Sequence, residues 1–363
     1  MTPQPIQTIE TEPTRPQFRR PGLQVILYVL RALGAFKLAQ FLTRSRLRIL
    51  GYHGIAVGDQ HEYSPFLFMR ESTFHRRLEI LRRRGVTVIS LDDAVKGLQI
   101  ASNRTLQAVI TIDDGWWSTL EYAAPLLQRF GYPATLYLST RHAVEQTPVA
   151  PVVLSYMFWK RNETRLALAG VAPSVDGTYD LGGVHGATHL LLEGKIAQLD
   201  SAAQARMLQQ VAAKLGLEAA ALTGDKRFHL IAMDDVHRLQ QMGVDTQLHT
   251  HSHFMPDDFE QFRQQLQQNQ DYIRMHSQGD TPRHFCYPSG RYTDKHAKWL
   301  EQLDIKSATT CDPGMNTSGQ NPYVLRRFLD SESISEIEFA GHVSGLFELA
   351  KLLRDAVGRY LGR

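Results

Sequence analysis

Short apolar segments alternate with helical patterns along most of this chain, and that order is the feature that most restricts its fold. Segments rich in β-branched and aromatic residues occur at residues 86–90, 108–112 and 134–138. Apolar residues at helical spacing separate them, and glycines end the helical stretches. Strict alternation of this kind predicts a parallel sheet, either open or closed into a barrel. The alternation lapses over residues 141–227, where we expect an inserted segment that caps the functional site.

The segment at residues 108–112 ends in two adjacent carboxylates, Asp113 and Asp114, followed by Gly115. A buried strand has no packing use for paired carboxylates, and two like charges this close repel unless a cation or a shared proton relieves them. The pair therefore indicates a metal ion, proton transfer, or both. The structural alternative is that one carboxylate caps the helix that follows.

The composition is that of a globular protein with one large domain or two smaller ones: 363 residues, 43% hydrophobic and 21% charged. The net charge is only +3, with basic and acidic residues interspersed, so we expect no nucleic-acid partner. The two cysteines, Cys286 and Cys311, form neither a disulfide framework nor a Cys-based zinc site. A metal would be held by histidine and carboxylate.

The two ends of the chain differ from the alternating region. Residues 1–21 contain repeated prolines and are expected to form a disordered tail. Residues 22–44 carry apolar residues at helical spacing but include Arg31 and Lys37, so they are too short and too charged to span a bilayer. We expect an amphipathic helix that packs on the domain, with peripheral membrane contact as the alternative. Without a clear signal peptide, we expect a cytoplasmic location, at the inner membrane face if that contact is made. Residues 346–363 are expected to form a C-terminal helix.

Four predicted strand ends carry residues suited to chemistry: His53, Asp113 with Asp114, His249 with His253, and Tyr287-Pro288-Ser289-Gly290. In a parallel α/β barrel all these strand ends open on one face. His249 and His253 are four residues apart, which on a helical turn places both imidazoles on one side, within reach of a metal. Two histidines and one aspartate leave coordination positions for water and substrate, as hydrolytic zinc sites require. His251, between them, is expected to point elsewhere.

These motifs resemble those of the polysaccharide deacetylase family, the NodB homology domain of carbohydrate esterase family 4. Thr111-Ile112-Asp113-Asp114-Gly115 resembles the family's TFDDG motif, and His249-Thr250-His251-Ser252-His253 resembles its H-S/T-x-x-H motif. The segment from Phe285 to Tyr292 is similar to the FAYPxGxY form of its third motif. The resemblance covers about residues 46–340 and implies a distorted (β/α) barrel, here within residues 45–345.

The resemblance also implies roles for individual residues. Asp114, His249 and His253 would bind a divalent metal, with Zn²⁺ first and Ni²⁺, Co²⁺ or Fe²⁺ as other choices. Asp113 would be the general base, and Thr250 would support the turn between the metal ligands. Many members carry an arginine in the third motif, which this chain lacks, and we expect Arg327 to supply that charge.

Two further assignments complete the expected site. The late Leu-x-His motif that supplies the general acid in many members is absent, and His342 lies in a helical pattern. We therefore expect His53, which ends the segment Leu50-Gly51-Tyr52-His53, to be the acid. Tyr287, Pro288, Ser289 and Gly290 are candidates for substrate and oxyanion contacts, and Trp116 offers an aromatic face that suits a sugar.

The expected activity is that of a hydrolase of carbon–nitrogen bonds other than peptide bonds. It would remove N-acetyl groups from an amino-sugar glycan, a polysaccharide or a lipid-linked saccharide, with a metal-bound water as nucleophile. Two alternatives stay open. The same site would cleave an acetyl ester of a carbohydrate, or the chain would be a catalytically silent glycan-binding relative.

Overall fold

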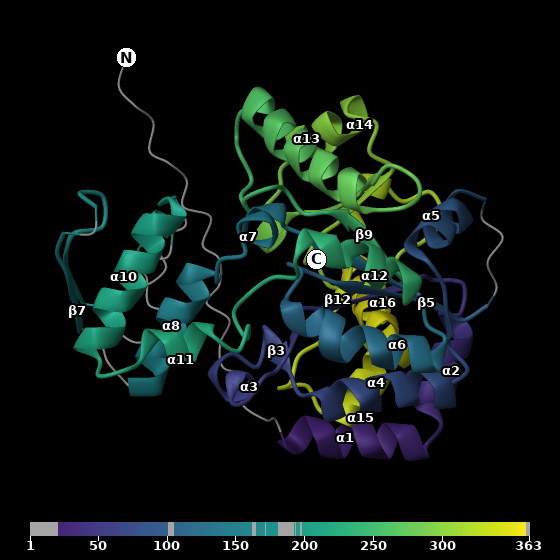
Figure 1. Cartoon of the computed structure of the whole chain (residues 1–363). Coiled ribbons are helices and arrows are strands. Elements are labelled where there is room, and N and C mark those ends of the chain that lie inside the picture. The colour runs from purple at the N-terminus through teal and green to yellow at the C-terminus, as the bar shows by residue number, and fades with distance from the viewer. Residues whose placement is uncertain are drawn as a thin grey trace.

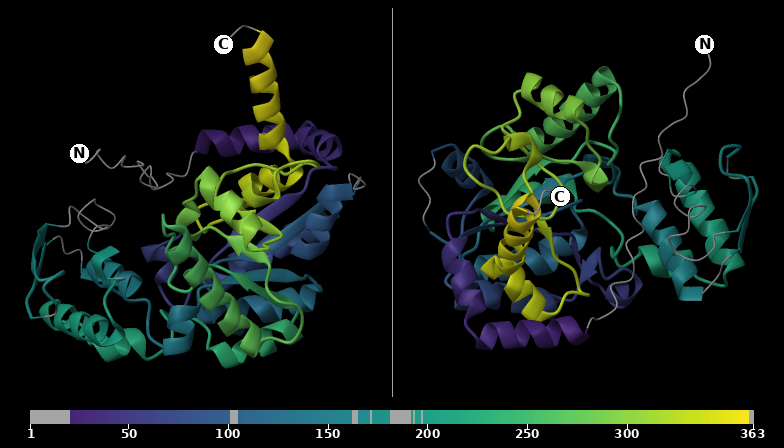
Figure 2. Two further views of the ribbon diagram at one scale, coloured as in Figure 1. Left: turned by 90° about the horizontal axis from the view of Figure 1, so that it is seen from above. Right: turned by 180° about the vertical axis from the view of Figure 1, so that it is seen from behind.

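The computed structural model describes residues 21–100, 105–161, 165–170, 172–180, 192, 194–196 and 198–360. The tail expected at residues 1–21 lies outside this part, except for Pro21, which begins the first helix. Figures 1 and 2 show a curled sheet surrounded by helices, with a smaller helical unit beside it.

One sheet organises the main domain, and its strands are parallel. The strand order is β11-β10-β9-β6-β5-β1-β12, and β4 also pairs with β5. The central strand β5 is buried from its second residue to its last, as both faces are covered. The strands of this sheet are β1 (Arg48–Tyr52), β4 (Thr87–Val88), β5 (Gln107–Ile112), β6 (Ala134–Leu138), β9 (Val244–Leu248), β10 (His284–Cys286), β11 (Ser307–Thr309) and β12 (Phe328–Leu329).

The two edges of this sheet are joined by the segment that leads into β12. Leu325 forms a parallel bridge with Thr309 of β11, and three residues later Phe328 pairs with Leu50 of β1. The backbone N–H of Leu325 donates to Ala308 O, and that of Thr310 donates to Leu325 O. The sheet therefore curls into a distorted barrel, as the sequence predicts. The last strand is short, because Pro322–Val324 forms a 3₁₀ turn and only Phe328–Leu329 is strand.

Helices cover the outside of the barrel (Figure 1). The helical stretch after β5 begins with a π-helical turn, Thr119–Ala123, and continues as α6 (Ala124–Phe130). Two short strands, β2 (Gly54–Ile55) and β3 (Phe68–Met69), pair beside the end of β1. The covering helices are α3 (Gln60–Tyr63), α4 (Glu71–Arg83), α5 (Leu91–Ile100), α6 (Ala124–Phe130), α7 (Thr140–Glu145), α12 (Val236–Gln241), α13 (Phe259–His276), α14 (Asp294–Gln302) and α15 (Glu336–Ser344), with 3₁₀ turns Met233–Asp235 and Pro288–Gly290.

The inserted segment builds a small unit of its own beside α3 and β3 (Figure 1). It contains α8 (Ala150–Arg161), the antiparallel pair β7 (Arg165–Leu168) and β8 (Gly177–Asp180), α10 (Ser201–Lys214) and α11 (Ala219–Thr223). Asp59 ties this unit to the barrel, because its carboxylate accepts hydrogen bonds from Tyr156 Oη (2.6 Å) and Lys160 Nζ. That the insertion caps the site stays a prediction.

The single helix expected over residues 22–44 is two helices, α1 (Pro21–Ala32) and α2 (Ala35–Leu42). Gly34, with φ of 81°, separates them, because this left-handed conformation ends a helix and suits glycine. Within the described residues no single helix could cross a membrane by length and composition, and α1 and α2 pass that test only as a pair bent by 78°. The last helix, α16 (Leu346–Tyr360), extends away from the body (Figure 2).

Candidate active site

Asp113 directly follows β5 and is held by a guanidinium from the segment that closes the barrel. Arg327 Nη1 and Nη2 donate to the two carboxylate oxygens of Asp113 at 2.7 and 2.8 Å. The Arg327 side chain is fully buried and Asp113 is 3% exposed. Burial alone would raise the pKa of Asp113, but the guanidinium outweighs it and the pKa lies below its usual value. Asp113 is therefore ionised at neutral pH and fixed in orientation.

Three more groups hold the Arg327 side chain in place. Its Nε donates to Thr310 O at 2.9 Å and its Nη1 to Thr111 Oγ1 at 3.1 Å. Its Nη2 also lies 3.1 Å from Cys286 Sγ, which in turn lies 3.8 Å from Asp113 Oδ2. Burial raises the pKa of the Cys286 thiol, so it stays protonated beside the carboxylate. The arginine expected to replace the missing third-motif charge is thus in contact with Asp113.

His53 follows β1 and lies near the same carboxylate. Its Nε2 is 3.9 Å from Asp113 Oδ2, and its ring packs at 5.2 Å from the ring of Phe66. Within the described residues its buried Nδ1 has no hydrogen-bond partner. The imidazole is therefore close to Asp113 and keeps a buried nitrogen without a protein partner among the described residues.

Asp114 faces a different pair of side chains from its neighbour Asp113. Its Oδ1 lies 3.5 Å from His249 Nε2 and 3.4 Å from His253 Nε2. One ligand atom from each of the three residues lies within 4.8 Å of the other two. Ligands in a tetrahedron about 2.1 Å from a zinc ion lie about 3.4 Å apart, so these three residues fit a small divalent cation.

The His249 ring is fixed for such a role by its second nitrogen. Its Nδ1 lies 2.8 Å from the carbonyl oxygen of Cys286, so the tautomer with hydrogen on Nδ1 leaves Nε2 free as a ligand. Its backbone N–H donates to Asn269 Oδ1 at 2.9 Å, and the Asn269 amide donates to Leu138 O and Thr140 Oγ1. This buried asparagine joins the ends of β6 and β9.

We expected His249 and His253 to lie on a helical turn, but the structure places them in a loop. Thr250 and His253 both have left-handed backbone conformations, with φ of 59° and 55°. Thr250 Oγ1 accepts a hydrogen bond from the backbone N–H of Phe254, so this residue supports the turn as predicted. The loop brings the rings of His249 and His253 to 4.9 Å between centroids. His251 points elsewhere, against Thr140 and the ring of Tyr272.

The chain turns sharply after Asp113, and this turn separates the two carboxylates. Asp114 has φ of 69°, in the left-handed region that aspartate tolerates better than most residues. Gly115 has φ of 99°, and a Cβ there would lie 2.2 Å from Leu138 Cδ1. Only glycine fits this position. The helix-cap interpretation does not hold in the structure, since neither carboxylate caps the helical turn that begins at Thr119.

Trp116 lies next to the metal-ligand candidates, but not as a face for a sugar. Its side chain is buried at 2% exposure, and the ring packs edge-on against Phe68. The indole Nε1 donates to Asp114 Oδ2 at 2.9 Å. Burial therefore removes the stacking surface that we expected, and the indole instead orients the Asp114 carboxylate.

The residues of the third motif, Tyr287 to Gly290, follow β10 and the Cys286 that contacts Arg327. Tyr287 is fully buried and its hydroxyl donates to Tyr323 O, and Pro288 is buried as well, so neither offers a side chain to a substrate. Ser289 is exposed, with φ of 54°, and within the described residues its backbone N–H has no acceptor. The backbone N–H of Gly290 already donates a hydrogen bond to Tyr287 O. Of the four, Ser289 has the free donor that an oxyanion contact needs.

Sequence reasoning missed Asn269 and the hydrogen bond from Trp116. Asn269 had a signal in the sequence, because it falls on the apolar face of α13 with Phe262, Leu266 and Ile273, where a polar residue needs buried partners.

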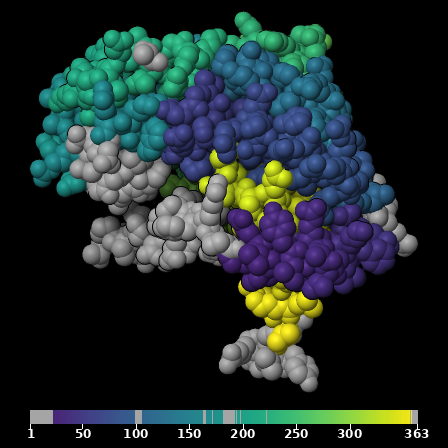
Figure 3. Space-filling view, turned by 90° about the horizontal axis from the view of Figure 1, so that it is seen from below, coloured from purple at the N-terminus to yellow at the C-terminus, as the bar shows by residue number. Residues whose placement is uncertain are grey.

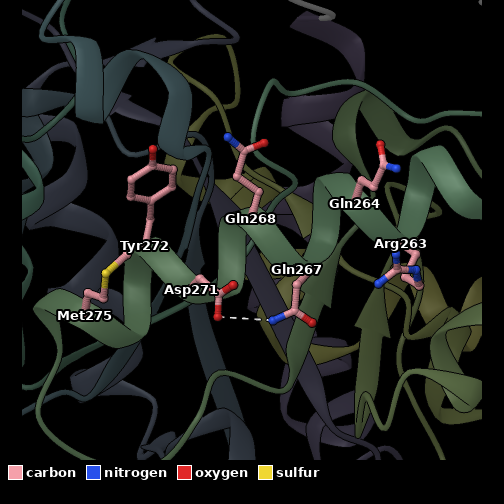
Figure 4. A pocket seen from close by; sticks show the side chains of 7 residues that line it. All are labelled: Arg263, Gln264, Gln267, Gln268, Asp271, Tyr272 and Met275. Carbon is pink, nitrogen blue, oxygen red and sulfur yellow. Dashed lines mark hydrogen bonds between the residues drawn. The ribbon is translucent and has the colours of Figure 1, made fainter.

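The hollow of about 400 Å³ along α13 is distinct from the site, since its lining includes none of the candidate residues (Figure 4). His342 is half-buried, with its ring packed between those of Phe328 and Phe347, so it is no alternative to His53.

Residues 103–308, more than half of the chain, match the family described as polysaccharide deacetylase, and this chain belongs to that family. The family implies a hydrolase of the deacetylase type that acts on glycans. A separate comparison with curated proteins found no match.

Solved structures share the fold at low sequence identity. IcaB from Ammonifex degensii is 15% identical, with a TM-score of 0.54 over 83% of this chain and 97% of that one. The deacetylase PplD of Streptococcus pyogenes, solved with acetate, is 16% identical, with a TM-score of 0.53 over 84% and 98%. A de-N-acetylase from Aggregatibacter actinomycetemcomitans is 14% identical, with a TM-score of 0.51 over 82% and 99%. These likenesses confirm the (β/α) barrel.

Proposed function

We propose that this protein is a metal-dependent N-deacetylase of an amino-sugar glycan. The observation that carries the proposal is the division of the adjacent carboxylates. Asp113 is paired with Arg327 and faces His53, whereas Asp114 faces His249 and His253. Hydrolysis of an amide needs both a base for water and an acid for the departing nitrogen, and this arrangement offers one candidate for each beside a cation site.

Asp114, His249 and His253 would hold the metal, and two histidines with one carboxylate are a ligand set found in hydrolytic zinc sites. A divalent cation bound there would supply the Lewis acid that activates water and polarises the acetyl carbonyl. Asp113, kept ionised by Arg327, accepts the proton of the attacking water. The backbone N–H of Ser289 is the candidate donor to the oxyanion that develops on the carbonyl.

His53 donates the proton that the departing nitrogen needs. An amine is a poor leaving group unless it is protonated as the carbon–nitrogen bond breaks, so this step separates amide from ester cleavage. The products are acetate and a free amino sugar. His53→Ala should therefore reduce N-deacetylation about 100-fold or more, and ester hydrolysis much less.

The test is acetate release from chito-oligosaccharides and from O-acetylated sugars, with the protein stripped by a chelator and then reloaded with Zn²⁺. Activity on the N-acetyl substrates that is lost on stripping and restored by Zn²⁺ supports the proposal. Release from esters alone would favour the carbohydrate O-acetyl esterase, and no release from either would favour the silent glycan-binding relative.

Asp113→Asn tests the division of the carboxylates directly. This variant should keep one metal ion per chain and lose turnover, because the amide cannot accept the proton. His237→Ala, on α12, is a matched histidine control that should leave activity unchanged. Loss of the metal from Asp113→Asn would show that the two aspartates have been assigned the wrong way round.

A further inference from the structure

The helices α1 and α2 present a surface that is too apolar for contact with water alone. Fifteen large apolar side chains are exposed in the described part of the chain, and eight of them lie within residues 25–42. Three more lie on α16, which begins beside α2. We call the exposed side chains of the first two helices the α1–α2 surface: Val25, Ile26, Tyr28, Val29, Leu33, Leu38, Phe41 and Leu42, each more than half exposed.

These side chains are not needed to hold the helices on the protein. Leu27, Phe36 and Ala39 point inward and are buried, and α1 and α2 pack through them against α15. Figure 3 shows the two helices uncovered on one face of the molecule, with α16 emerging beside them. An apolar area of this extent on a folded protein marks a binding surface.

The charge within the segment that forms this surface is of one sign. Residues 22–47 contain Arg31, Lys37, Arg44 and Arg46 and no aspartate or glutamate. Arg46 is neutralised by Glu348 at 3.1 Å, but within the described residues the other three form no ion pair. Arg44 lies over the ring of Phe41, 4.2 Å from its centroid, so this cation borders the apolar surface directly.

This pattern decides between a membrane and a second copy of the chain. A symmetric dimer through α1 and α2 would bring the unpaired cations of the two copies together, with no carboxylate in the segment to compensate. An anionic phospholipid surface supplies the opposite charge and an apolar layer at the same time. Arg44 also lines a cavity of about 350 Å³, together with the polar residues Ser45, Thr105 and Thr317.

The surface lies at the end of the barrel away from the candidate active site. Arg48 is the first residue of β1, and its guanidinium donates to Thr43 O at the end of α2 and to Val343 O of α15. His53 and Asp113 follow the opposite ends of β1 and the parallel β5. We propose that the α1–α2 surface binds an anionic phospholipid membrane, with the active-site end of the barrel facing away from the bilayer.

The test is flotation of the full-length protein with vesicles of phosphatidylcholine alone or with one quarter phosphatidylglycerol, at low and high salt. The wild type should bind the anionic vesicles, less at high salt. Replacing Arg31, Lys37 and Arg44 by glutamine should lower the partition coefficient about fivefold for each cation. Replacing Ile26, Val29 and Leu33 by glutamine should abolish binding. The matched controls are Met275→Gln and Lys298→Gln, an exposed methionine on α13 and an exposed lysine on α14, and both should bind as the wild type does.

Two results would overturn the proposal. One is failure of the wild type to bind anionic vesicles. The other is a dimer in solution, measured by light scattering, that the Ile26, Val29 and Leu33 replacements dissociate, since this would make a second copy the occupant. Acetate release from soluble substrates should be unchanged in all these variants, so the result does not depend on the proposed catalytic chemistry.

Discussion

Replacing Arg327 by methionine would leave Asp113 as a buried carboxylate without its cation. The change removes two charge-assisted hydrogen bonds of 2.7 and 2.8 Å in a place where Arg327 is fully buried. Breaking one partner of a buried pair costs about 3–5 kcal/mol of unfolding free energy, because the remaining charge stays desolvated. With a urea slope of about 3 kcal/mol per molar, the unfolding midpoint should fall by roughly 1 M or more.

The double variant Arg327→Met with Asp113→Asn separates this charge effect from simple loss of packing. Without the carboxylate no uncompensated charge remains, so the double variant should be more stable than Arg327→Met alone, with a coupling energy of about 2 kcal/mol or more. Arg326→Met, at the exposed neighbouring position, is the matched control and should change stability by less than about 0.5 kcal/mol.

The measurement is urea unfolding of metal-free protein, together with acetate release by the zinc-loaded form. Arg327→Met should lose about 100-fold or more in kcat/KM, because Asp113 would no longer be held in place as an ionised base. Equal urea midpoints for Arg327→Met and the double variant would refute the reasoning. Wild-type activity of Arg327→Met would refute it independently.

Three further predictions follow from the same geometry. Trp116→Phe keeps the ring but removes the hydrogen bond to Asp114, so zinc affinity measured by competition should fall about 10-fold, whereas Trp117→Phe should leave it unchanged. Gly115→Ala places a methyl group 2.2 Å from Leu138 Cδ1 and should destabilise the protein by more than about 2 kcal/mol, against about 1 kcal/mol for Gly131→Ala, which has free space; equal losses would contradict this. Burial lowers the pKa of His342 to about 3, so between that value and about 6.5 the unfolded chain takes up a proton that the folded protein excludes, and stability falls as the pH falls. The wild type should lose about 2 kcal/mol more than His342→Leu between pH 7.5 and pH 5 in urea unfolding, and a pH-independent difference would exclude this contribution.

The barrel and the metal-ligand candidates could be predicted because both depend on local patterns. Strand β5 is a continuous apolar run, and polar residues at strand ends stand out against it, so Asp113, Asp114, His249 and His253 could be found one segment at a time. Parallel strands then place their carboxyl ends together whatever the details of the connections.

What could not be predicted from the residues alone depends on tertiary contacts. Arg327 reaches Asp113 only because Leu325 pairs with β11 and Phe328 pairs with β1. These two pairings place Arg327, which lies between them in the sequence, where the barrel closes. No spacing in the sequence encodes that closure, and Arg327 was expected only through the family resemblance. The burial of Trp116 likewise depends on Phe68, which is distant in sequence.

The separate tasks of the two aspartates follow from the backbone at the end of β5. Alternation along a strand would already turn consecutive side chains to opposite sides, but it would leave both carboxylates in the barrel wall. The left-handed conformation of Asp114 instead takes the chain out of the strand after one residue, and Gly115 can follow because it has no Cβ to meet Leu138. Asp113 stays within reach of Arg327 inside the barrel, while Asp114 is carried to the loop that holds His249 and His253. Two carboxylates that would repel each other in a regular strand are therefore compensated separately, one by a guanidinium and the other by a site suited to a cation.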